Sequence, residues 1–339
     1  MRGAQLAKLV RRLVVEGVVD ADAARDGRIT VTDLSRSNPV GLVCLDGGPE
    51  IVVKGGTIAR DGVDPVPAEL AAYEWLGMSP DTARLAPAPL LAVAGATAVV
   101  SQWLPGAVSL HDALAAGANS GENLIAEVGR MLGVLHRARH GLRRLAIRRP
   151  WILDVPAGGM PVIALDNDPA SRLIEALRQC APLLATIASV DATWTPRTMI
   201  HGDIKFDNIL VAGERMLFVD WELAGLGPPA WDLAGVVDGL LVPACIQGDC
   251  KMVDAAYVAQ LAEPAVAAHR AAAGPEFSPS LPELAAATAA RLAQTATQLA
   301  AMGHDCPDAA AGAPRVLAKA AELADRLVSQ PMPAAACAL

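Results

Sequence analysis

Residues 198–222, TMIHGDIKFDNILVAGERMLFVDWE, constrain the fold of this chain more than any other segment. Two short β-rich runs, residues 209–212 and 216–219, flank a possible turn at residues 213–215. This pattern predicts two antiparallel strands joined by a three-residue turn that contains glycine. The segment therefore predicts a β-hairpin with polar side chains near its open end.

The assumed register of this hairpin brings two polar residues together. If Ala212 faces Met216, Asn208 faces Asp220. Directly opposed residues in a ladder lie about 4.5–5.5 Å apart. Their side-chain oxygens can then share a divalent cation, and Mg²⁺ prefers hard oxygen ligands. The register therefore predicts a magnesium site formed by Asn208 and Asp220.

A third polar residue, Asp203, precedes Asn208 in the loop that leads into the hairpin. A carboxylate there can accept or orient the proton of an attacking hydroxyl. A carboxylate base followed by Asn and then Asp is also the order of parts in protein-kinase phosphoryl transfer. The constellation therefore points to ATP, Mg²⁺ and a hydroxyl acceptor.

The rest of the chain divides into an α+β part and a helical part. Up to residue 105, a helix is followed by strands at 40–45 and 51–54, a helix at 66–76 and two strands around Gly95. This predicts a small β-rich lobe. Residues 106–330 are mostly amphipathic or Ala-rich and predict a large helical lobe, with single helices at 122–140 and 171–190. Residues 331–339 are a predicted tail.

Composition excludes several classes of protein. The chain is 53% hydrophobic, but no stretch approaches the ~20 uninterrupted apolar residues of a membrane span. Basic residues are interspersed through the apolar N-terminus, as in an amphipathic helix rather than a signal peptide. The formal net charge of −8 argues against nucleic-acid binding. A cytoplasmic protein with no membrane and no nucleic-acid partner is expected.

The motifs HGDIKFDNILV and FVDWELAGLGPPAWDLA resemble the signature of the aminoglycoside phosphotransferase and choline-kinase superfamily. The resemblance implies the two-lobed fold of protein kinases and transfer of the ATP γ-phosphate to a hydroxyl. It is strong over residues 198–235 and looser elsewhere.

The resemblance also implies roles for residues of the motifs. Asp203 is similar to the family's catalytic base, and His201 to the histidine that braces the catalytic loop. Asn208 and Asp220 are similar to its metal ligands. The remaining two residues are Glu222, expected either to touch a second metal or to lie outside the ligand shell, and Asp232, expected to tie the loop to the next helix.

The first lobe should supply the nucleotide contacts. Lys54 ends the strand IVVK and resembles the lysine that pairs the α- and β-phosphates, although a strand-end lysine can also simply reach solvent. Glu69 resembles the carboxylate that orients this lysine, with Glu74 as a competing partner. Backbone groups around Gln102 and Leu104 are expected to meet the adenine edge.

The expected phosphate loop is DLSRSNPVGLV, in which Ser37 and Asn38 match the family's positions and Arg36 can help to bind phosphate. It has no glycine before Gly41, unlike many relatives, so backbone N–H groups of polar residues would have to cradle the phosphates.

The acceptor is left open by the sequence, because function depends on the site and not on the fold. The carboxylates between residues 240 and 330 are dispersed, whereas an aminoglycoside needs them clustered. Choline needs an aromatic cage, and only 3% of the residues are aromatic. Two hypotheses rank equally: an unidentified small-molecule hydroxyl, and Ser or Thr of a ribosomal precursor peptide with a partner lyase.

The basic run at 136–149, HRARHGLRRLAIRR, is compatible with a peptide partner, although such runs are usually solvated. A catalytically silent pseudokinase that binds nucleotide as a scaffold is the alternative from another class. The presence of Lys54, Asp203, Asn208 and Asp220 argues against it.

Overall fold

A computed structural model describes residues 2–35, 39–48, 50–55, 65–92, 98–117, 121–165, 167–303 and 306–329. The chain forms two compact units, Met1–Val108 with Leu210–Ala224, and Ser109–Ile209 with Gly225–Leu339. The sequence predicts two continuous lobes with a boundary after residue 105, whereas each unit of the structure consists of two segments of the chain. It does not predict that the segment Leu210–Ala224 joins the first unit.

The first unit is built on a five-stranded antiparallel sheet with the order β1-β2-β3-β5-β4. Its strands are β1 (Ile29–Asp33), β2 (Val40–Leu45), β3 (Glu50–Gly55), β4 (Pro89–Ala92) and β5 (Ala98–Gln102). The helices of this unit are α1 (Arg2–Val15), α2 (Ala21–Arg25), α3 (Pro65–Leu76) and α4 (Pro80–Ala83).

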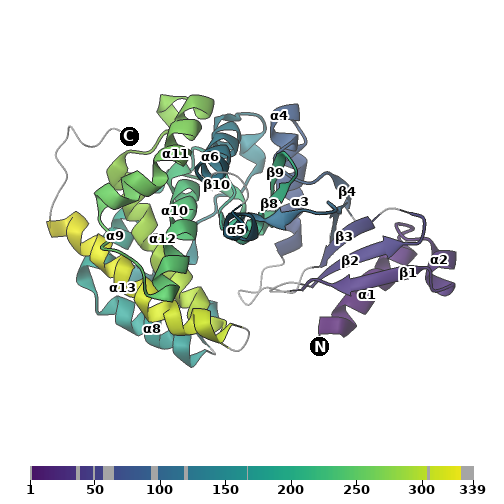
Figure 1. Ribbon diagram of the computed structural model, residues 1–339, viewed down its shortest axis with the longest axis horizontal. Coiled ribbons are helices and arrows are strands. Elements are labelled where there is room, and N and C mark those ends of the chain that lie inside the picture. Colours follow the sequence, from purple (N-terminus) through teal and green to yellow (C-terminus); the bar gives the residue numbers. More distant parts are fainter. Residues whose placement is uncertain are drawn as a thin grey trace. The chain divides into compact units, whose positions relative to one another are not determined.

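Helix α1 covers one face of this sheet (Figure 1). Leu6, Leu9 and Leu13 lie on one side of the helix and are buried with Val43 and Val53 of the sheet. This apolar stripe at helical spacing is the amphipathic pattern that the N-terminal sequence predicts.

The hairpin of the motif segment consists of β8 (Ile209–Ala212) and β9 (Arg215–Phe218), in a small sheet with the order β6-β8-β9 that includes β6 (Val108–Ser109). Its turn has two residues, Gly213 and Glu214, instead of the three predicted. Gly213 has a φ of 63°, which suits glycine in such a tight hairpin turn. A turn of two residues is one residue shorter than the assumed one, so the assumed register of the hairpin is shifted by one residue, and a shared role of Asn208 and Asp220 stays a prediction.

The hairpin belongs to the first unit because its own residues pack there. The backbone N–H of Phe218 donates to the carbonyl of Leu85 over 2.7 Å. The short 3-10 helix η4 (Trp221–Leu223), which follows β9, packs against α3. Trp221 is fully buried in this contact region, so the residues after β9 are held firmly beside α3.

The second unit is mostly helical. Its α-helices are α5 (Leu110–Ala115), α6 (Gly121–Arg137), α7 (Val162–Leu165), α8 (Asp168–Arg178), α9 (Ala181–Ala192), α10 (Pro229–Gln247), α11 (Ala255–Ala273), α12 (Leu281–Ala301) and α13 (Pro307–Ser329). The 3-10 helices are η1 (Leu142–Arg144), η2 (Trp151–Ala157), η3 (Phe206–Asn208) and η5 (Pro275–Phe277). Two short strands, β7 (Thr198–Ile200) and β10 (Gly225–Gly227), pair antiparallel.

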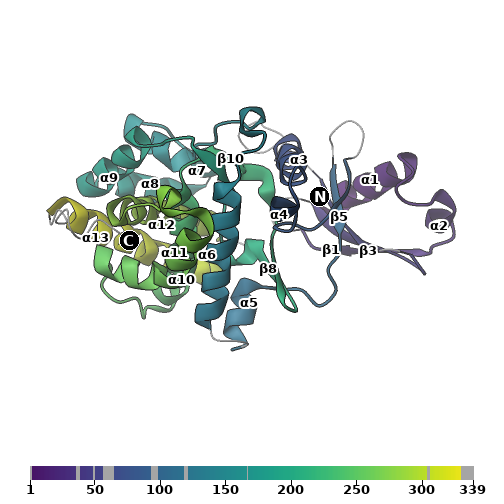
Figure 2. The ribbon, with the colours of Figure 1, turned by 90° about the horizontal axis from the view of Figure 1, so that it is seen from above.

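Helices α6 and α11 form the most extensive helix contact of this unit and lie side by side in Figure 2. Two glycines of α6 allow the close approach. A Cβ on Gly129 would lie 2.0 Å from the carbonyl oxygen of Ala265, and one on Gly133 would lie 2.7 Å from that of His269. The absence of side chains at these two positions therefore sets the spacing of the helices.

The single helix predicted at residues 171–190 is two helices, α8 and α9, at an angle of 91°. Pro182 lies in the first turn of α9. Proline has no N–H and clashes with the preceding turn, so a helix can begin there but cannot run through it. The hydrophobic periodicity of the segment continues across this break and concealed it.

Helix α10 is long and apolar enough to span a membrane, with 19 residues and a mean hydropathy of 1.4. Within the unit, 67% of the most apolar 18-residue stretch of this helix is buried. It also carries the buried carboxylates of Asp232 and Asp238. The apolar composition of α10 is therefore explained by its place in the core of the second unit.

Candidate functional site

In the first unit, Lys54 near the end of β3 lies among three carboxylates. Its Nζ is 2.7 Å from Glu69 Oε2 on α3 and 2.8 Å from Glu222 Oε2 on η4. It also forms an ion pair with Asp220 Oδ1 at the start of η4. The Lys54 side chain is 11% exposed, so it does not extend to solvent as a strand-end lysine can. Glu74, the competing partner, is exposed.

Burial lowers the pKa of Lys54, but the charges of Glu69, Asp220 and Glu222 outweigh it and raise the pKa overall. The lysine is therefore a permanent cation. Burial raises the pKa of Glu69, and the charge of Lys54 opposes this increase. Glu69 depends on Lys54, because without this cation its charge would be buried without compensation, whereas Lys54 also pairs with Asp220 and Glu222.

Asp220 has a left-handed backbone conformation, with a φ of 69°. Among the residues that the structure describes, it is the one non-glycine residue with a positive φ. Aspartate tolerates this conformation better than most residues do, and such conformations are frequent at functional sites. The unusual backbone turns the chain from β9 into η4 and places Asp220 and Glu222 on the same lysine.

These carboxylates form a candidate cation site. One oxygen each of Glu69, Asp220 and Glu222 lies within 4.8 Å of the others. Carboxylate oxygens are the donors that Mg²⁺ prefers, and Asp220 and Glu222 are 30% and 22% exposed at their side chains. The donor chemistry fits a hard divalent cation bound by Asp220 and Glu222. Lys54 would then keep its ion pair with Glu69.

In the second unit, Asp203 lies in the loop between β7 and η3 with a largely buried side chain. Its Oδ2 accepts from Lys205 Nζ over 2.8 Å and from Asn208 Nδ2 over 3.1 Å. Asn208 Nδ2 also donates to the backbone carbonyl of Asp203 over 3.0 Å. In this arrangement the amide of Asn208 braces the loop, and its role as a metal ligand stays a prediction.

Burial raises the pKa of Asp203, but the charges of Lys205 and Arg291 outweigh this and hold the pKa well below its ordinary value. The carboxyl group is therefore ionised at neutral pH, as a proton acceptor must be. Arg291 Nη2 is 3.8 Å from Oδ1, whereas Lys205 and Asn208 donate to Oδ2.

Asp232, at the start of α10, binds the backbone of the loop that carries Asp203. Its carboxylate accepts from the backbone N–H groups of His201 over 2.8 Å and Gly202 over 2.9 Å. It also contacts His136 Nε2 on α6 at 3.1 Å. His201 itself is buried, and its Nδ1 accepts from the backbone N–H of Asp203 over 3.3 Å. Both residues therefore support the loop that carries Asp203.

Three further residues contact Asp203, its loop or Asp232, and are not predicted from the sequence as site residues. Lys205 lies within the motif itself, two residues after Asp203, and its positive charge so near the carboxylate indicates an ion pair that the sequence could have predicted. His136 ends a predicted amphipathic helix, where it could be read only as part of a basic run. Arg291 lies in an Ala-rich helix far along the chain, where no local pattern marks it.

The predicted nucleotide contacts of the first unit are only partly described. Ser37, Asn38 and Arg36 lie outside the described residues. The backbone N–H of Gln102 donates to Ala88 O over 3.2 Å, and the carbonyl of Leu104 accepts from Ala107 N over 3.1 Å. The N–H of Gln102 is thus already used within the sheet, and an adenine contact from this segment stays a prediction.

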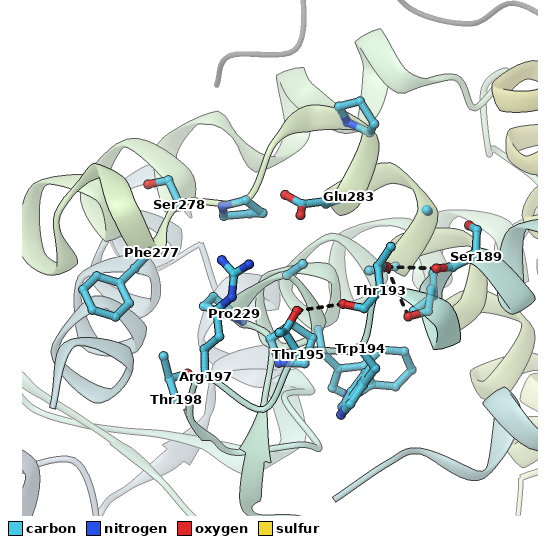
Figure 3. A pocket seen from close by; sticks show the side chains of 18 of the residues that line it. Ser189, Thr193, Trp194, Thr195, Arg197, Thr198, Pro229, Phe277, Ser278 and Glu283 are labelled. Carbon is cyan, nitrogen blue, oxygen red and sulfur yellow. Dashed lines mark hydrogen bonds between the residues drawn. The ribbon is translucent and has the colours of Figure 1, made fainter. Parts of the chain in front are cut away.

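The second unit also contains a cavity of about 240 Å³ between α9, η5 and the first turns of α10 and α12. Figure 3 shows Arg197 and Glu283 reaching into it above Thr195 and Thr198. The predicted catalytic and metal-binding residues are not among its lining. Trp231 joins the cavity to the loop, because it lines the cavity and its Nε1 donates to Gly202 O over 3.0 Å.

Comparison with solved structures identifies the fold. Choline kinase LicA from Streptococcus pneumoniae has a TM-score of 0.62 at 12% identity, and covers 91% of this chain and 99% of its own. An aminoglycoside phosphotransferase from Alicyclobacillus acidocaldarius has a TM-score of 0.53 at 16% identity, over 92% and 95% of the two chains. LicA in complex with AMP matches with a TM-score of 0.58 at 13% identity, over 92% and 98%. The two units therefore have the fold of kinase-like phosphotransferases.

The sequence itself confirms this class. Residues 35–269, more than half of the chain, match the model of the phosphotransferase enzyme family, and the chain belongs to that family. No curated protein sequence matches it. The protein is a kinase-type phosphotransferase that acts on a hydroxyl group. The predicted superfamily, the two-lobed fold and the class of enzyme are confirmed.

Proposed function

We propose that this protein transfers the γ-phosphate of ATP to the hydroxyl of a small molecule, with Mg²⁺ as the metal and Asp203 as the proton acceptor. The observation that carries this proposal is the environment of Asp203. Its carboxylate is held ionised by Lys205 and Arg291, and its Oδ2 is oriented by two hydrogen bonds.

In the proposed reaction the acceptor's hydroxyl oxygen forms a bond to the γ-phosphorus. The bond from that phosphorus to the bridging β–γ oxygen breaks, ADP leaves with the electron pair, and the hydroxyl proton passes to Asp203. A carboxylate of low pKa is a weak base toward a free alcohol. The proton therefore transfers as the new phosphorus–oxygen bond forms and the hydroxyl becomes more acidic.

Lys54 is proposed to bind the nucleotide phosphates while Glu69 holds its side chain in place. Asp220 and Glu222 would hold Mg²⁺, which neutralises phosphate charge when it is bound. Their present contacts with Lys54 support this role, because the same three carboxylates already attract positive charge in a largely buried position.

The acceptor is proposed to be neither choline nor an aminoglycoside. Asp254 and Glu283, two of the dispersed carboxylates, cap the N-termini of α11 and α12. Phe277 is buried beneath the guanidinium of Arg139 at 4.5 Å from its ring centroid. These side chains already have structural partners, which weakens both cationic acceptors.

The basic run is one of the features compatible with the peptide hypothesis and its partner lyase, together with the Ala-rich helical insert and the N-terminal segment. Arg149 of that run pairs with Asp191 and Asp154, and Arg139 also donates to the carbonyl of Arg197. These local contacts favour a structural role for the run. The scaffold hypothesis is disfavoured by the orientation of Asp203, which nucleotide binding alone does not need.

The test is ATP consumption by the purified protein with Mg²⁺ against sugar, polyol, choline, ethanolamine, aminoglycoside and Ser/Thr-peptide acceptors. We expect transfer to a small-molecule alcohol, and about a 10²–10⁴-fold lower kcat in Asp203→Asn with nucleotide binding retained. Asp308→Asn, a change of an exposed aspartate on α13, serves as the control. Transfer only to peptides would contradict the choice of acceptor, and full activity of Asp203→Asn would contradict the mechanism.

A further inference from the structure

Arg291, in the middle of α12, is a buried arginine whose partners lie in the loop of Asp203. The residue is 2% exposed. Its Nη1 donates to the carbonyl of Gly202 over 3.2 Å, and its Nη2 donates to the carbonyl of Ile204 over 2.7 Å. A rigid planar guanidinium thus binds the backbone directly before and directly after Asp203.

The guanidinium of Arg291 also lies near one oxygen of the Asp203 carboxylate, while other residues bind the second oxygen. Arg291 Nη2 lies 3.8 Å from Asp203 Oδ1, whereas Lys205 and Asn208 both bind Oδ2. Turning the plane of the carboxylate away from this arrangement would weaken the contact with Arg291 at one oxygen and the hydrogen bonds from Lys205 and Asn208 at the other. Arg291 therefore favours one orientation of the side chain as well as one path of the backbone.

The other face of the guanidinium is covered by an aromatic ring. Arg291 Cζ lies 5.2 Å from the ring centroid of Trp231, whose Nε1 donates to the carbonyl of Gly202. The arginine is thus packed between α10 and the loop, and the ring restricts the orientation of its planar guanidinium. A lysine could supply the charge but not the two parallel contacts to the backbone.

We propose that Arg291 is a positioning residue for phosphoryl transfer, which holds Asp203 so that Oδ2 is directed to the acceptor hydroxyl. This inference rests on the proposed role of Asp203. Arg291 acts through Asp203 and does not itself contact the reacting atoms. A displacement of about 1 Å at a reacting group can cost on the order of 10²-fold in rate, so such support is kinetically important.

The chain offers a matched control for Arg291. Arg315, on α13, also donates to two successive backbone carbonyls, Cys245 and Ile246, near the end of α10. Replacing either arginine with methionine removes a guanidinium that joins a helix to a backbone segment. Only Arg291 joins its helix to the segment of Asp203, so the pair separates positioning from general stability.

The experiment compares kcat and KM for ATP in Arg291→Met, Arg291→Lys and Arg315→Met. We expect kcat to fall about 10–10²-fold in Arg291→Met, with KM for ATP changed less than about twofold. Arg291→Lys should recover part of the loss because it keeps the charge near Oδ1. Arg315→Met should keep the wild-type kcat. Equal kcat in the Arg291 and Arg315 variants would overturn the proposal, and Arg291→Lys alone decides it if Arg291→Met does not fold.

Hydrogen exchange of the loop provides a readout that needs no turnover. The N–H of Gly202 donates to Asp232 on α10 and that of Asp203 donates to His201 Nδ1, and we expect the exchange of both to accelerate in Arg291→Lys but not in Arg315→Met. Unchanged exchange in Arg291→Lys would contradict the proposal. A wild-type protein that transfers phosphate to no acceptor would contradict the proposed function instead, while the exchange comparison still tests the support of the loop.

Discussion

Asp203 and Asp238 are both buried in the second unit, yet their carboxyl groups are shifted in opposite directions. Lys205 and Arg291 lower the pKa of Asp203 against the effect of burial. Burial dominates at Asp238 on α10 and raises its pKa to about 6, although Arg291 and a hydrogen bond from Thr295 oppose it. Both carboxyl groups are buried, so the difference between their pKa values comes from the number and closeness of their charged partners.

The raised pKa of Asp238 predicts a pH dependence of stability. The folded state binds this proton more tightly than the unfolded chain, whose ordinary value is 3.8. The stabilisation is therefore complete below pH ~4 and is lost as pH rises through about 6. Asp238→Asn removes this pH-dependent part of the free energy of unfolding. It amounts to on the order of 3 kcal/mol between low and high pH, because one pKa unit corresponds to about 1.4 kcal/mol.

Urea denaturation of the wild type and of Asp238→Asn at pH 4.5 and pH 8 measures the effect through the difference between the two proteins. We expect the variant to gain stability relative to the wild type at pH 8. Asp249→Asn, a change of an exposed aspartate just beyond the end of the same helix, should show no such gain. A constant difference between wild type and Asp238→Asn at both pH values would contradict the assignment.

At the scale of elements, the contact of α6 with α11 depends on residues that have no side chain. The position of Gly129 leaves no space for a Cβ, because the obstacle is the backbone of Ala265. Backbone atoms cannot rotate away as the end of a flexible side chain can, so the helices must separate if this position is filled. The packing of α6 against α11 is therefore sensitive to the addition of a single methyl group.

We predict that Gly129→Ala lowers the free energy of unfolding by about 1–3 kcal/mol, despite the higher helix propensity of alanine. Gly121→Ala, in the first turn of the same helix, is the control, because among the described residues its Cβ would meet a flexible side chain, that of Leu114 at 3.1 Å, and no backbone. Thermal denaturation measures both variants. Equal stability of the two would show that α6 and α11 adjust without cost.

At the scale of the whole molecule, each unit carries part of the proposed machinery. The first unit holds Lys54 with its carboxylates, and the second holds the loop of Asp203. The contacts of Lys54 described above join residues of the first unit, and those of Asp203 join residues of the second. Ligand binding is the property that reports on the folded molecule as a whole, because only the native state binds the ligand.

We predict that Mg²⁺ and ATP together raise the melting temperature, since a ligand at 100 times its Kd adds about 2.7 kcal/mol to the free energy of unfolding. Asp220→Asn should lose most of the Mg²⁺-dependent part of this shift because it removes a charged oxygen from the proposed metal site. Asp46→Asn, an exposed change in the first unit, is the control. An undiminished shift in Asp220→Asn would place the metal elsewhere.

Many residues of the candidate site could be proposed from the sequence because they lie in one continuous segment of the chain. The order of His201, Asp203, Asn208 and Asp220 is fixed by covalent spacing, and the strands around them are short and unmistakable. The hairpin register was harder, because one residue more or less in a turn shifts every pairing after it. The break between α8 and α9 was missed because periodicity continued across Pro182.

The sequence by itself determined the class of the enzyme, the two-lobed fold and the identity of the motif residues, because these depend on local spacing and on the period of apolar residues. Tertiary structure alone decided that Arg291 and His136 support the loop, that Lys54 meets Glu69 rather than Glu74, and that the hairpin joins the first unit. These contacts connect residues distant in the chain, and their geometry follows from packing, which no local pattern contains.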